Sequence, residues 1–504
     1  MKKILVLGGG AAGWLTAIFA KKLFPENEIK LIESEKIGIL GAGEGSTPHL
    51  ISFLNFLNIN IFDLIKKTKG TIKYGINFEN WNGDNQKYFH NFSSHNKLNP
   101  FYIKNSFTHD CYTKYLIDSC SKNLNLNDYL YGSILTENKK TDIINESFSL
   151  HFDAHLLANF LKAIAIERGV LHDVGELKNL DKDKKGNIKK VNLKNSKSFF
   201  CDFIFDCSGF SRLVIGKKYK TPWVSYQKNL PMKKAIPFFL NQESEILPCT
   251  HAIAMKYGWI WKIPLQHRFG SGYIFDSDYI NEEQALREAE KKLNQKLISP
   301  KVISFDAGRF EKVWVKNCIA VGLSAGFTEP LEATSLYITV QQLLFLAHFK
   351  DDLFEISNFN RNNFNSFMAN TNDDVLDFLY LHYLTKRKDS PFWKNFKKNT
   401  IIPKSLQEKI EHLKENNFIA QNYDYRKKFA GFSINSYIVV SYGLGLLKSK
   451  LIKKISGLEP SQKEYRNEML NIIKNLKSHN NFLEQINSNG GANANREITN
   501  IETN

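Results

Sequence analysis

The 504-residue chain lacks the long apolar segments that mark a membrane protein. Its longest apolar runs, such as residues 438–447, fall well short of the roughly 20 residues that a spanning helix needs. At the N-terminus, Lys2 and Lys3 lead directly into an apolar segment, with no signal-peptide cleavage site. We therefore expect no membrane partner and a cytoplasmic location.

Cysteine is scarce, and its positions follow neither a disulfide nor a zinc pattern. The chain has six cysteines, no Cys-x-x-Cys pair and no histidine at the spacing of a zinc site. We expect reduced, structural thiols and no bound metal. The six positions are Cys111, Cys120, Cys201, Cys207, Cys249 and Cys318.

Positive charge is in excess, with a net charge of +17, but no nucleic-acid recognition module is evident. Lysines are spread along the chain and mixed with acids, as in residues 181–185, which read Asp-Lys-Asp-Lys-Lys. Scattered charge of this kind is typical of solvated surface. We therefore expect no nucleic-acid partner.

Alternating strand and helix patterns predict an α/β fold. Residues 2–7 and 28–33 read as apolar strands that bracket a helical pattern over residues 11–23. A further strand signal at residues 203–206 follows the helical pattern of residues 154–168. Another, at residues 318–321, precedes the helical pattern of residues 334–349. In doubly wound sheets the ends of such strands converge on one ligand site.

The remaining segments predict a substrate region and a helical C-terminal part. Aromatic-rich, alternating stretches at about residues 70–110 and 225–275 favour an antiparallel sheet over a ligand cleft, within a core of residues 1–350. Residues 351–486 show helical patterns and are expected to cover the substrate. Residues 487–504, rich in Asn, Gly and Ala, predict a disordered tail.

Residues 8–13 fit the G-x-G-x-x-G fingerprint of dinucleotide-binding turns, in which small residues let the backbone approach a pyrophosphate. A strand precedes this turn and a helix follows it, which favours binding over a plain tight turn. Glu33 ends the next strand, where a carboxylate can bind ribose hydroxyls. These residues leave NAD and FAD as alternatives. The predicted contacts are Gly8, Gly10, Ala11, Ala12, Gly13 and Glu33.

Two further motifs are ambiguous when each is considered alone. Residues 40–48 read Leu-Gly-Ala-Gly-Glu-Gly-Ser-Thr-Pro, which fits a ligand loop or a structural turn. In residues 258–264, Trp259 and Trp261 share one face of a strand, a pattern more often found in a core than in a site.

Together, these three motifs resemble the signature set of flavin-dependent halogenases of the tryptophan halogenase family. Supporting segments are residues 78–81, 152–156, 205–210 and 327–332. The resemblance implies a Rossmann-like, flavin-monooxygenase-like FAD-binding core with a β-sheet substrate region and a helical C-terminal part. It also implies FADH2 as cofactor, a halide co-substrate and a small aromatic substrate such as an indole. Since only one dinucleotide fingerprint is evident, we infer no separate NAD(P)H site and expect a separate flavin reductase to supply the FADH2. A homodimer is one of the assemblies left open.

The resemblance also implies roles for single residues. Lys73 occupies the place of the lysine that delivers hypohalous acid, and Glu332 that of the glutamate that accepts the ring proton. Without the resemblance, we would interpret Lys73 as an ordinary solvated side chain and Glu332 as a favourable charge at a helix N-terminus. The two tryptophans would form a wall between substrate and flavin. Further FAD contacts are expected at Gly43, Glu44, Ser46 and Leu323.

The sequence departs from the family pattern at the halide and substrate sites. Tryptophan-specific members continue Ser-Thr-Gly after the glutamate, whereas this chain has Ala333, Thr334 and Ser335. We expect halide against the backbone at Thr334 and Ser335, with serine restricting φ and adding bulk. A preference for bromide or iodide over chloride is our hypothesis.

His90 and Phe92 fall where the family places aromatic residues around the substrate ring. The segment ending at Phe432 replaces a tryptophan-bearing helix that clamps free tryptophan in specific members. We therefore expect a substrate other than free tryptophan, such as an indole derivative, a phenol or a pyrrole.

Two other functions stay open. An FAD-dependent aromatic monooxygenase would share the fingerprint, but such enzymes commonly carry a Gly-Asp pair where residues 321–326 read Val-Gly-Leu-Ser-Ala-Gly. A non-catalytic flavin-binding protein would have no need to retain Lys73, Glu332 and both tryptophans.

Overall fold

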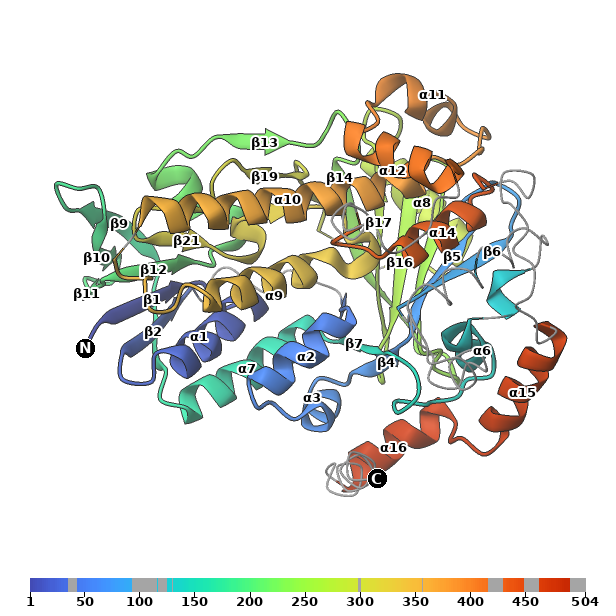
Figure 1. Ribbon diagram of the computed structural model, residues 1–504, viewed down its shortest axis with the longest axis horizontal. Coiled ribbons are helices and arrows are strands. Elements are labelled where there is room, and N and C mark those ends of the chain that lie inside the picture. The colour runs from blue at the N-terminus through green and yellow to red at the C-terminus, as the bar shows by residue number, and fades with distance from the viewer. Residues whose placement is uncertain are drawn as a thin grey trace.

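Two large sheets lie side by side, with helices packed along and across them (Figure 1). The computed structural model describes residues 1–34, 43–92, 116, 125–128, 130–297, 301–355, 357–415, 429–447 and 462–489. One sheet contains six strands and the other seven, and three small sheets of three strands accompany them.

The six-stranded sheet has the order β20-β21-β12-β1-β2-β8 and is parallel except for the β20–β21 pair. Its strands are β1 (Lys3–Leu7), β2 (Glu28–Glu33), β8 (Leu171–Val174), β12 (Phe203–Asp206), β20 (Trp314–Val315) and β21 (Cys318–Ala320). The strands predicted at residues 2–7, 28–33, 203–206 and 318–321 are confirmed. The apolar runs of β1, β12 and β21 are buried on both faces, whereas in β2 only Ile29, Leu31 and Ile32 are fully buried.

Alternate residues of β1 pack into two different cores. Ile4 and Val6 join the cluster formed with the helices, whereas Leu5 and Leu7 face a small sheet on the other side. The helices are α1 (Ala11–Leu23), α2 (Pro48–Phe56), α3 (Ile61–Lys67), α7 (Ala154–Glu167) and α9 (Thr334–Ala347). The small sheet consists of β9 (Leu177–Lys182), β10 (Ile188–Leu193) and β11 (Ser198–Phe200). The parallel sheet is therefore covered on both faces.

The seven-stranded sheet has the order β18-β14-β17-β16-β15-β5-β6. Its strands are β5 (Gly75–Glu79), β6 (Lys87–Asn91), β14 (Lys234–Leu240), β15 (Thr250–Ala254), β16 (Gly258–Pro264), β17 (Phe269–Phe275) and β18 (Ile303–Ser304). The antiparallel sheet predicted from residues 70–110 and 225–275 is largely confirmed, although β5 pairs with β15 in parallel. The long connection between β6 and β15 allows that direction. Residues 93–110 lie outside the described residues.

Two further small sheets have three strands each. One consists of β3 (Glu44–Gly45), β7 (Ser149–Phe152) and β4 (Thr71–Lys73), in the order β3-β7-β4. The other consists of β13 (Trp223–Ser225), β19 (Gly308–Phe310) and β22 (Gly326–Phe327). The first of them brings the glycine-rich segment at Glu44 beside Lys73.

Helices dominate the chain after residue 351. Helix α10 runs from above the six-stranded sheet to the seven-stranded sheet (Figure 1). The helices of this part are α10 (Asn358–His382), α11 (Pro391–Asn399), α12 (Lys404–Glu415), α14 (Ile434–Gly443), α15 (Gln462–Lys474) and α16 (His479–Asn489). Two others lie earlier, α6 (Tyr131–Glu137) and α8 (Glu282–Leu293). Residues 490–504, most of the predicted tail, lie outside the described residues.

Helix length and apolarity decide whether the described part of the chain could cross a membrane. In that part of the chain no single helix is long and apolar enough to cross a membrane, and one pair, α2 and α3, bent by 113°, passes the same test by length and composition. No cluster of three metal-ligating side chains occurs in these ranges. Of the cysteines, Cys201, Cys207, Cys249 and Cys318 are buried and free, whereas Cys111 and Cys120 lie outside the described ranges.

Candidate active site

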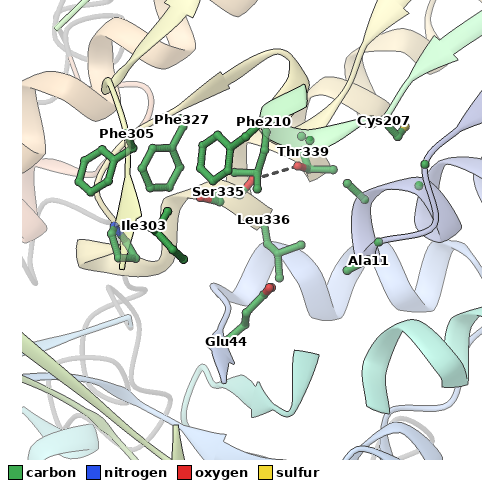
Figure 2. Close-up of a pocket in the computed structure, with 18 of the residues that line it drawn as sticks. Ala11, Glu44, Cys207, Phe210, Ile303, Phe305, Phe327, Ser335, Leu336 and Thr339 are labelled. Atoms are coloured by element: carbon green, nitrogen blue, oxygen red, sulfur yellow. Dashed lines mark hydrogen bonds between the residues drawn. The ribbon is translucent and has the colours of Figure 1, made fainter. Parts of the chain in front are cut away.

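A cavity of about 750 Å³ extends from the carboxyl ends of β1, β2 and β12 to the seven-stranded sheet. Its lining therefore combines residues of both sheets, such as Leu7 and Ile32 from the first and Ile76 and Trp259 from the second. Figure 2 shows Ala11 at one end, and Phe210, Phe327 and Phe305 in a row along one wall. The volume lies near the upper end of the range of small-molecule sites.

The glycine fingerprint forms one end of this cavity. Gly8, Gly10, Ala11, Ala12 and Gly13, the predicted cofactor contacts, all line it. A Cβ on Gly13 would lie 1.9 Å from the carbonyl oxygen of Gly8, so only glycine allows the turn to pack this closely. Helix α1 begins here without a side-chain cap, which leaves its first backbone N–H groups available to a phosphate.

Glu33 is held against the same turn. Its Oε1 accepts hydrogen bonds from Lys162 Nζ at 2.8 Å and from His172 Nε2 at 2.9 Å. A Cβ on Gly9 would lie 1.7 Å from Oε2, so the carboxylate rests on the glycine backbone. The carboxylate is thus held in place at the end of β2 by Lys162 and His172, two supports that sequence reasoning missed.

The remaining residues predicted to bind FAD divide into two groups. Gly43, Glu44 and Leu323 line the cavity, and Figure 2 shows Glu44 pointing toward Leu336. Burial, with a smaller contribution from Asp153, raises the pKa of Glu44 to about 7. Ser46 is not among the lining residues.

Ser46 instead lies beneath the cavity wall and supports Lys73. Its side-chain oxygen lies 2.6 Å from Ser149 Oγ, and its backbone oxygen accepts a hydrogen bond from Lys73 Nζ at 3.1 Å. The prediction of a direct flavin contact therefore has no support in this geometry. The close approach of Lys73 explains the glycine that follows Glu44, because a Cβ on Gly45 would lie 3.2 Å from Nζ.

Lys73 is fully buried at the end of β4 and lines the cavity. Burial lowers its pKa to about 8, and the negative charge of Glu332 opposes that shift. Its ammonium nitrogen lies 4.8 Å from the ring centroid of Phe92. Lys73 and Phe92, which were predicted separately as a catalytic and a substrate residue, therefore lie together, although Phe92 itself is not a lining residue.

Glu332 lies in a strained turn before α9, with φ of +68°, and the following Ala333 has φ of +58°. His90 Nδ1 lies 2.8 Å and His382 Nε2 3.0 Å from its Oε1. Burial alone would raise the pKa of Glu332, but the two histidines outweigh it and hold the pKa at about 2. The carboxylate is thus ionised at neutral pH.

Trp259 and Trp261 form part of the cavity wall, with ring centroids 6.2 Å apart. Their location on one face of β16 confirms the period-two prediction. Trp259 Nε1 lies 3.2 Å from Glu329 Oε2 and 3.0 Å from the Tyr383 hydroxyl oxygen. The ring of Trp261 lies over Gly272 of the next strand, where a Cβ would come within 2.0 Å of it.

The residues predicted to hold halide lie at the start of α9. Ser335 lines the cavity, whereas Thr334 is buried with its side-chain oxygen 2.9 Å from Thr328 Oγ1. The restriction of φ by serine has no consequence here, because the left-handed residues are Glu332 and Ala333, while Ser335 has helical backbone that any residue adopts. The serine side chain at position 335 still adds bulk beside the N-terminus of α9, which has no side-chain cap.

His90 and Phe432 lie in an aromatic cluster behind Glu332 and do not line the cavity. Phe378 of α10 is at its centre, with ring centroids 3.9 Å from Phe432, 5.3 Å from His90 and 5.1 Å from His382. Sequence reasoning missed His382, because a histidine in an apolar helix carries no local signal of its contact with a residue fifty positions away.

Comparison with known proteins identifies a family. Residues 3–457 match the family model described as tryptophan halogenase. Tryptophan 6-halogenase SttH of Streptomyces toxytricini is 30% identical over 498 residues, which cover 91% of this chain and 90% of that enzyme. Tryptophan 7-halogenase RebH of Lentzea aerocolonigenes is 30% identical over 533 residues, covering 96% and 98%.

Solved structures of flavin-dependent halogenases agree with this family match. Xcc4156, a flavin-dependent halogenase from Xanthomonas campestris, superposes with a TM-score of 0.85 at 26% identity, over 96% of this chain and 98% of that chain. BrvH, a flavin-dependent halogenase from Brevundimonas sp. BAL3, gives a TM-score of 0.84 at 27% identity, over 96% and 99%. The chain therefore belongs to the tryptophan halogenase family and is a flavin-dependent halogenase.

Proposed function

We propose that this halogenase uses hypohalous acid, handled by Lys73, to halogenate an electron-rich aromatic ring such as an indole, with Glu332 as the proton acceptor. The observation that carries the proposal is that Lys73 and Glu332, far apart in the chain, line one cavity with the dinucleotide turn. Both side chains are buried and their charges interact.

The cavity fits FAD. The close-packed glycine turn, the uncapped start of α1 and the carboxylate of Glu33 suit a pyrophosphate and a ribose. When bound and reduced, FAD supplies hypohalous acid from oxygen and halide. The described residues show one such turn, which supports supply of FADH2 by a separate flavin reductase.

Lys73 is suited to hold hypohalous acid. As an ammonium, its Nζ can donate a hydrogen bond to the oxygen and direct the halogen toward the substrate. With a pKa of about 8, a minor part of Lys73 is neutral at pH 7 and could form a haloamine, with water as the second product. In either route the ring carbon bonds to the halogen as the halogen's bond to oxygen or nitrogen breaks.

Glu332 is suited to complete the substitution. Its ionised carboxylate stabilises the cationic ring intermediate through charge. The ring C–H bond then breaks, its electron pair restores the aromatic system, and the carboxylate takes the proton. Because the pKa of Glu332 is held at about 2, the acceptor stays ionised beside Lys73 throughout the neutral range.

The wall and the halide site complete the proposal. Trp259 and Trp261 would keep the organic substrate from the flavin and so suppress oxygenation. Halide would lie against the uncapped N-terminus of α9 near Ser335, where backbone N–H groups favour an anion. We retain the hypothesis that bromide or iodide is preferred, and dominance of chlorinated product in mixed halides contradicts it.

The test is a reconstituted assay with FAD, a flavin reductase, NADH and equal concentrations of chloride, bromide and iodide. A panel of indoles and phenols is offered, and products are identified by mass. We expect a halogenated product that depends on the reductase. Oxygenated product without halogen would instead indicate a monooxygenase, and NADH oxidation without product a non-catalytic flavoprotein.

The decisive variant is Lys73→Met, which keeps the length of the side chain and removes the amine. We expect it to lose halogenation while still binding FAD. The matched control is Lys67→Met, on the exposed end of α3, which we expect to behave as the wild type. Equal halogenation by Lys73→Met and the wild type would refute the role of Lys73.

A further inference from the structure

Two histidines contact the same oxygen of Glu332 but differ in what their second nitrogen does. His90 approaches Oε1 through Nδ1 at 2.8 Å, and His382 approaches it through Nε2 at 3.0 Å. Both rings are buried, with 2% and 0% exposure. Bulk water therefore does not decide their protonation, and the hydrogen bonds do.

The second nitrogen of His382 has a fixed partner. Nδ1 lies 2.8 Å from the backbone oxygen of Phe378, one turn earlier in α10. A carbonyl oxygen only accepts, so Nδ1 carries a hydrogen. A neutral imidazole has one N–H, which would leave a bare Nε2 facing a carboxylate oxygen, acceptor against acceptor. An additional proton must therefore lie between His382 Nε2 and Glu332 Oε1.

His90 has no such constraint. Its Nε2 is buried and has no hydrogen-bond partner among the described residues. A neutral ring with its hydrogen on Nδ1 satisfies the contact with Glu332. Both lone pairs of Oε1 are then used, whereas Oε2 has no partner among the same residues.

The surroundings of His382 favour an imidazolium only as part of an ion pair. Its ring packs 4.7 Å from Phe78, 5.1 Å from Phe378 and 6.0 Å from Trp81, measured between centroids. An isolated charge would be costly in such an apolar environment, and a paired one is tolerated.

The other titratable groups around Glu332 do not replace this cation. Lys73 on β4 interacts with Glu332 through charge, but its Nζ donates a hydrogen bond to the backbone oxygen of Ser46. Burial raises the pKa of Tyr88, on β6, well above its ordinary value, so that it stays neutral. His90, also on β6, can serve as a neutral donor.

We propose that His382 is a positioning residue that carries the additional proton as an imidazolium, keeps Glu332 ionised and leaves Oε2 as the oxygen that receives the ring proton. This inference rests on the proposed function of Glu332. In the step itself the ring C–H bond breaks, its electrons return to the ring and an O–H bond forms at Oε2. His382 keeps its proton throughout.

The first test needs no substrate or flavin. Apoprotein labelled with 15N in its histidine rings is examined by NMR between about pH 5 and about pH 8. The signals lost in His382→Gln are expected to be those of an imidazolium across this range. The signals lost in His90→Gln are expected to be those of a neutral ring with its hydrogen on Nδ1.

The second test is the pH profile of bromination of indole in single turnover, with the same matched pair of variants. Glutamine can donate one hydrogen bond to Oε1 but carries no charge. His382→Gln is expected to move the acid limb upward by about 1 to 3 pH units, the range for loss of an adjacent opposite charge. His90→Gln, which keeps a neutral donor to Oε1, is expected to lower the rate and to move the acid limb less than His382→Gln does.

The outcomes separate this inference from the proposed function. A neutral His382 ring in the NMR spectrum, or equal shifts of the acid limb in the two variants, overturns the inference. If His382→Gln does not fold, a wild-type spectrum without any imidazolium signal at about pH 8 overturns it equally. A wild type that brominates no indole refutes the proposed function, and the NMR test still decides the charge of His382.

Discussion

The indole nitrogen of Trp259 lies 3.2 Å from Glu329 Oε2, and the hydroxyl of Tyr383 donates to the same oxygen. Tyr383 follows His382, which binds Glu332. Two adjacent residues at the end of α10 therefore hold both carboxylates of the Glu-Pro-Leu-Glu turn, and one of them is tied to the tryptophan wall. The wall and the proposed proton acceptor are positioned by a single helix end.

Glu329→Gln is expected to become more stable relative to the wild type as pH rises from about 4.5 to about 7. Burial raises the pKa of Glu329 to about 7, although hydrogen bonds from Tyr383 and Trp259 oppose the shift. Since the folded-state pKa exceeds the unfolded value, the folded protein binds more protons in this window, and wild-type stability falls with rising pH. The expected difference is roughly 3 kcal/mol, measured by urea unfolding.

Glu329→Leu is the companion variant, because it removes the acceptor as well as the charge. Its two buried donors, Trp259 Nε1 and the Tyr383 hydroxyl, would lose the carboxylate, at a cost of about 1–3 kcal/mol for each donor left unpaired. We expect it to be less stable than Glu329→Gln at every pH. A stability of Glu329→Gln that falls relative to the wild type between about pH 4.5 and about pH 7 would contradict the account.

Lys73→Met is expected to be more stable than the wild type at neutral pH, although it loses activity. Burial lowers the pKa of Lys73 from 10.5 to about 8, so the unfolded chain binds more protons between these values and wild-type stability rises with pH through that window. The full penalty, up to about 3 kcal/mol, applies below pH 8. Urea unfolding at about pH 7 and pH 10 should show the advantage of methionine shrinking at the higher pH.

The parts of this molecule that sequence reasoning found share a local pattern. The strand-helix-strand start was predictable because β1 is apolar on both faces and is followed by glycines that only close packing explains. Lys73 and Glu332 came from the resemblance alone, since nothing in their immediate neighbourhood distinguishes a buried lysine in a three-residue strand from a solvated one.

The parts that it missed depend on contacts between distant segments. His382 and Tyr383 contact the turn at Glu332 because α10, which is 25 residues long, ends beside that turn. His479 contacts Ile72 across 407 positions. Ser46 was predicted to touch the cofactor, but the pairing of β3 with β7 turns its carbonyl toward Lys73. No periodicity or spacing in the sequence indicates such contacts between distant segments.

His479→Phe is expected to weaken β4 and reduce halogenation. His479 Nε2 accepts from the Ile72 backbone N–H at 3.2 Å, and its Nδ1 lies 2.9 Å from the Ile246 carbonyl oxygen. Phenylalanine would leave both buried backbone groups unpaired, at about 1–3 kcal/mol each. Ile72 directly precedes Lys73, so displacement of the strand moves the amine.

The measurements are urea unfolding and the single-turnover rate of halogenation. His479→Gln can restore one donor and one acceptor and is expected to recover part of both. Asn481→Ala, at an exposed position of the same helix, is the control and should match the wild type. If His479→Phe loses stability without any fall in the halogenation rate, His479 does not position Lys73.

Gly45→Ala is expected to lower halogenation more than its small size suggests. A methyl group there would lie 3.2 Å from Lys73 Nζ and 3.7 Å from Ala333 Cβ, so the amine must shift by a few tenths of an ångström and its hydrogen bond to Ser46 lengthens. Misplacement of a reacting group by about 1 Å can cost about 100-fold in rate, so we expect a fall of roughly 10-fold.

A double-mutant cycle tests the cause: the stability cost of Gly45→Ala should disappear in a Lys73→Ala background, where the crowded amine is absent. An equal cost in both backgrounds would show that the added methyl group acts on another neighbour.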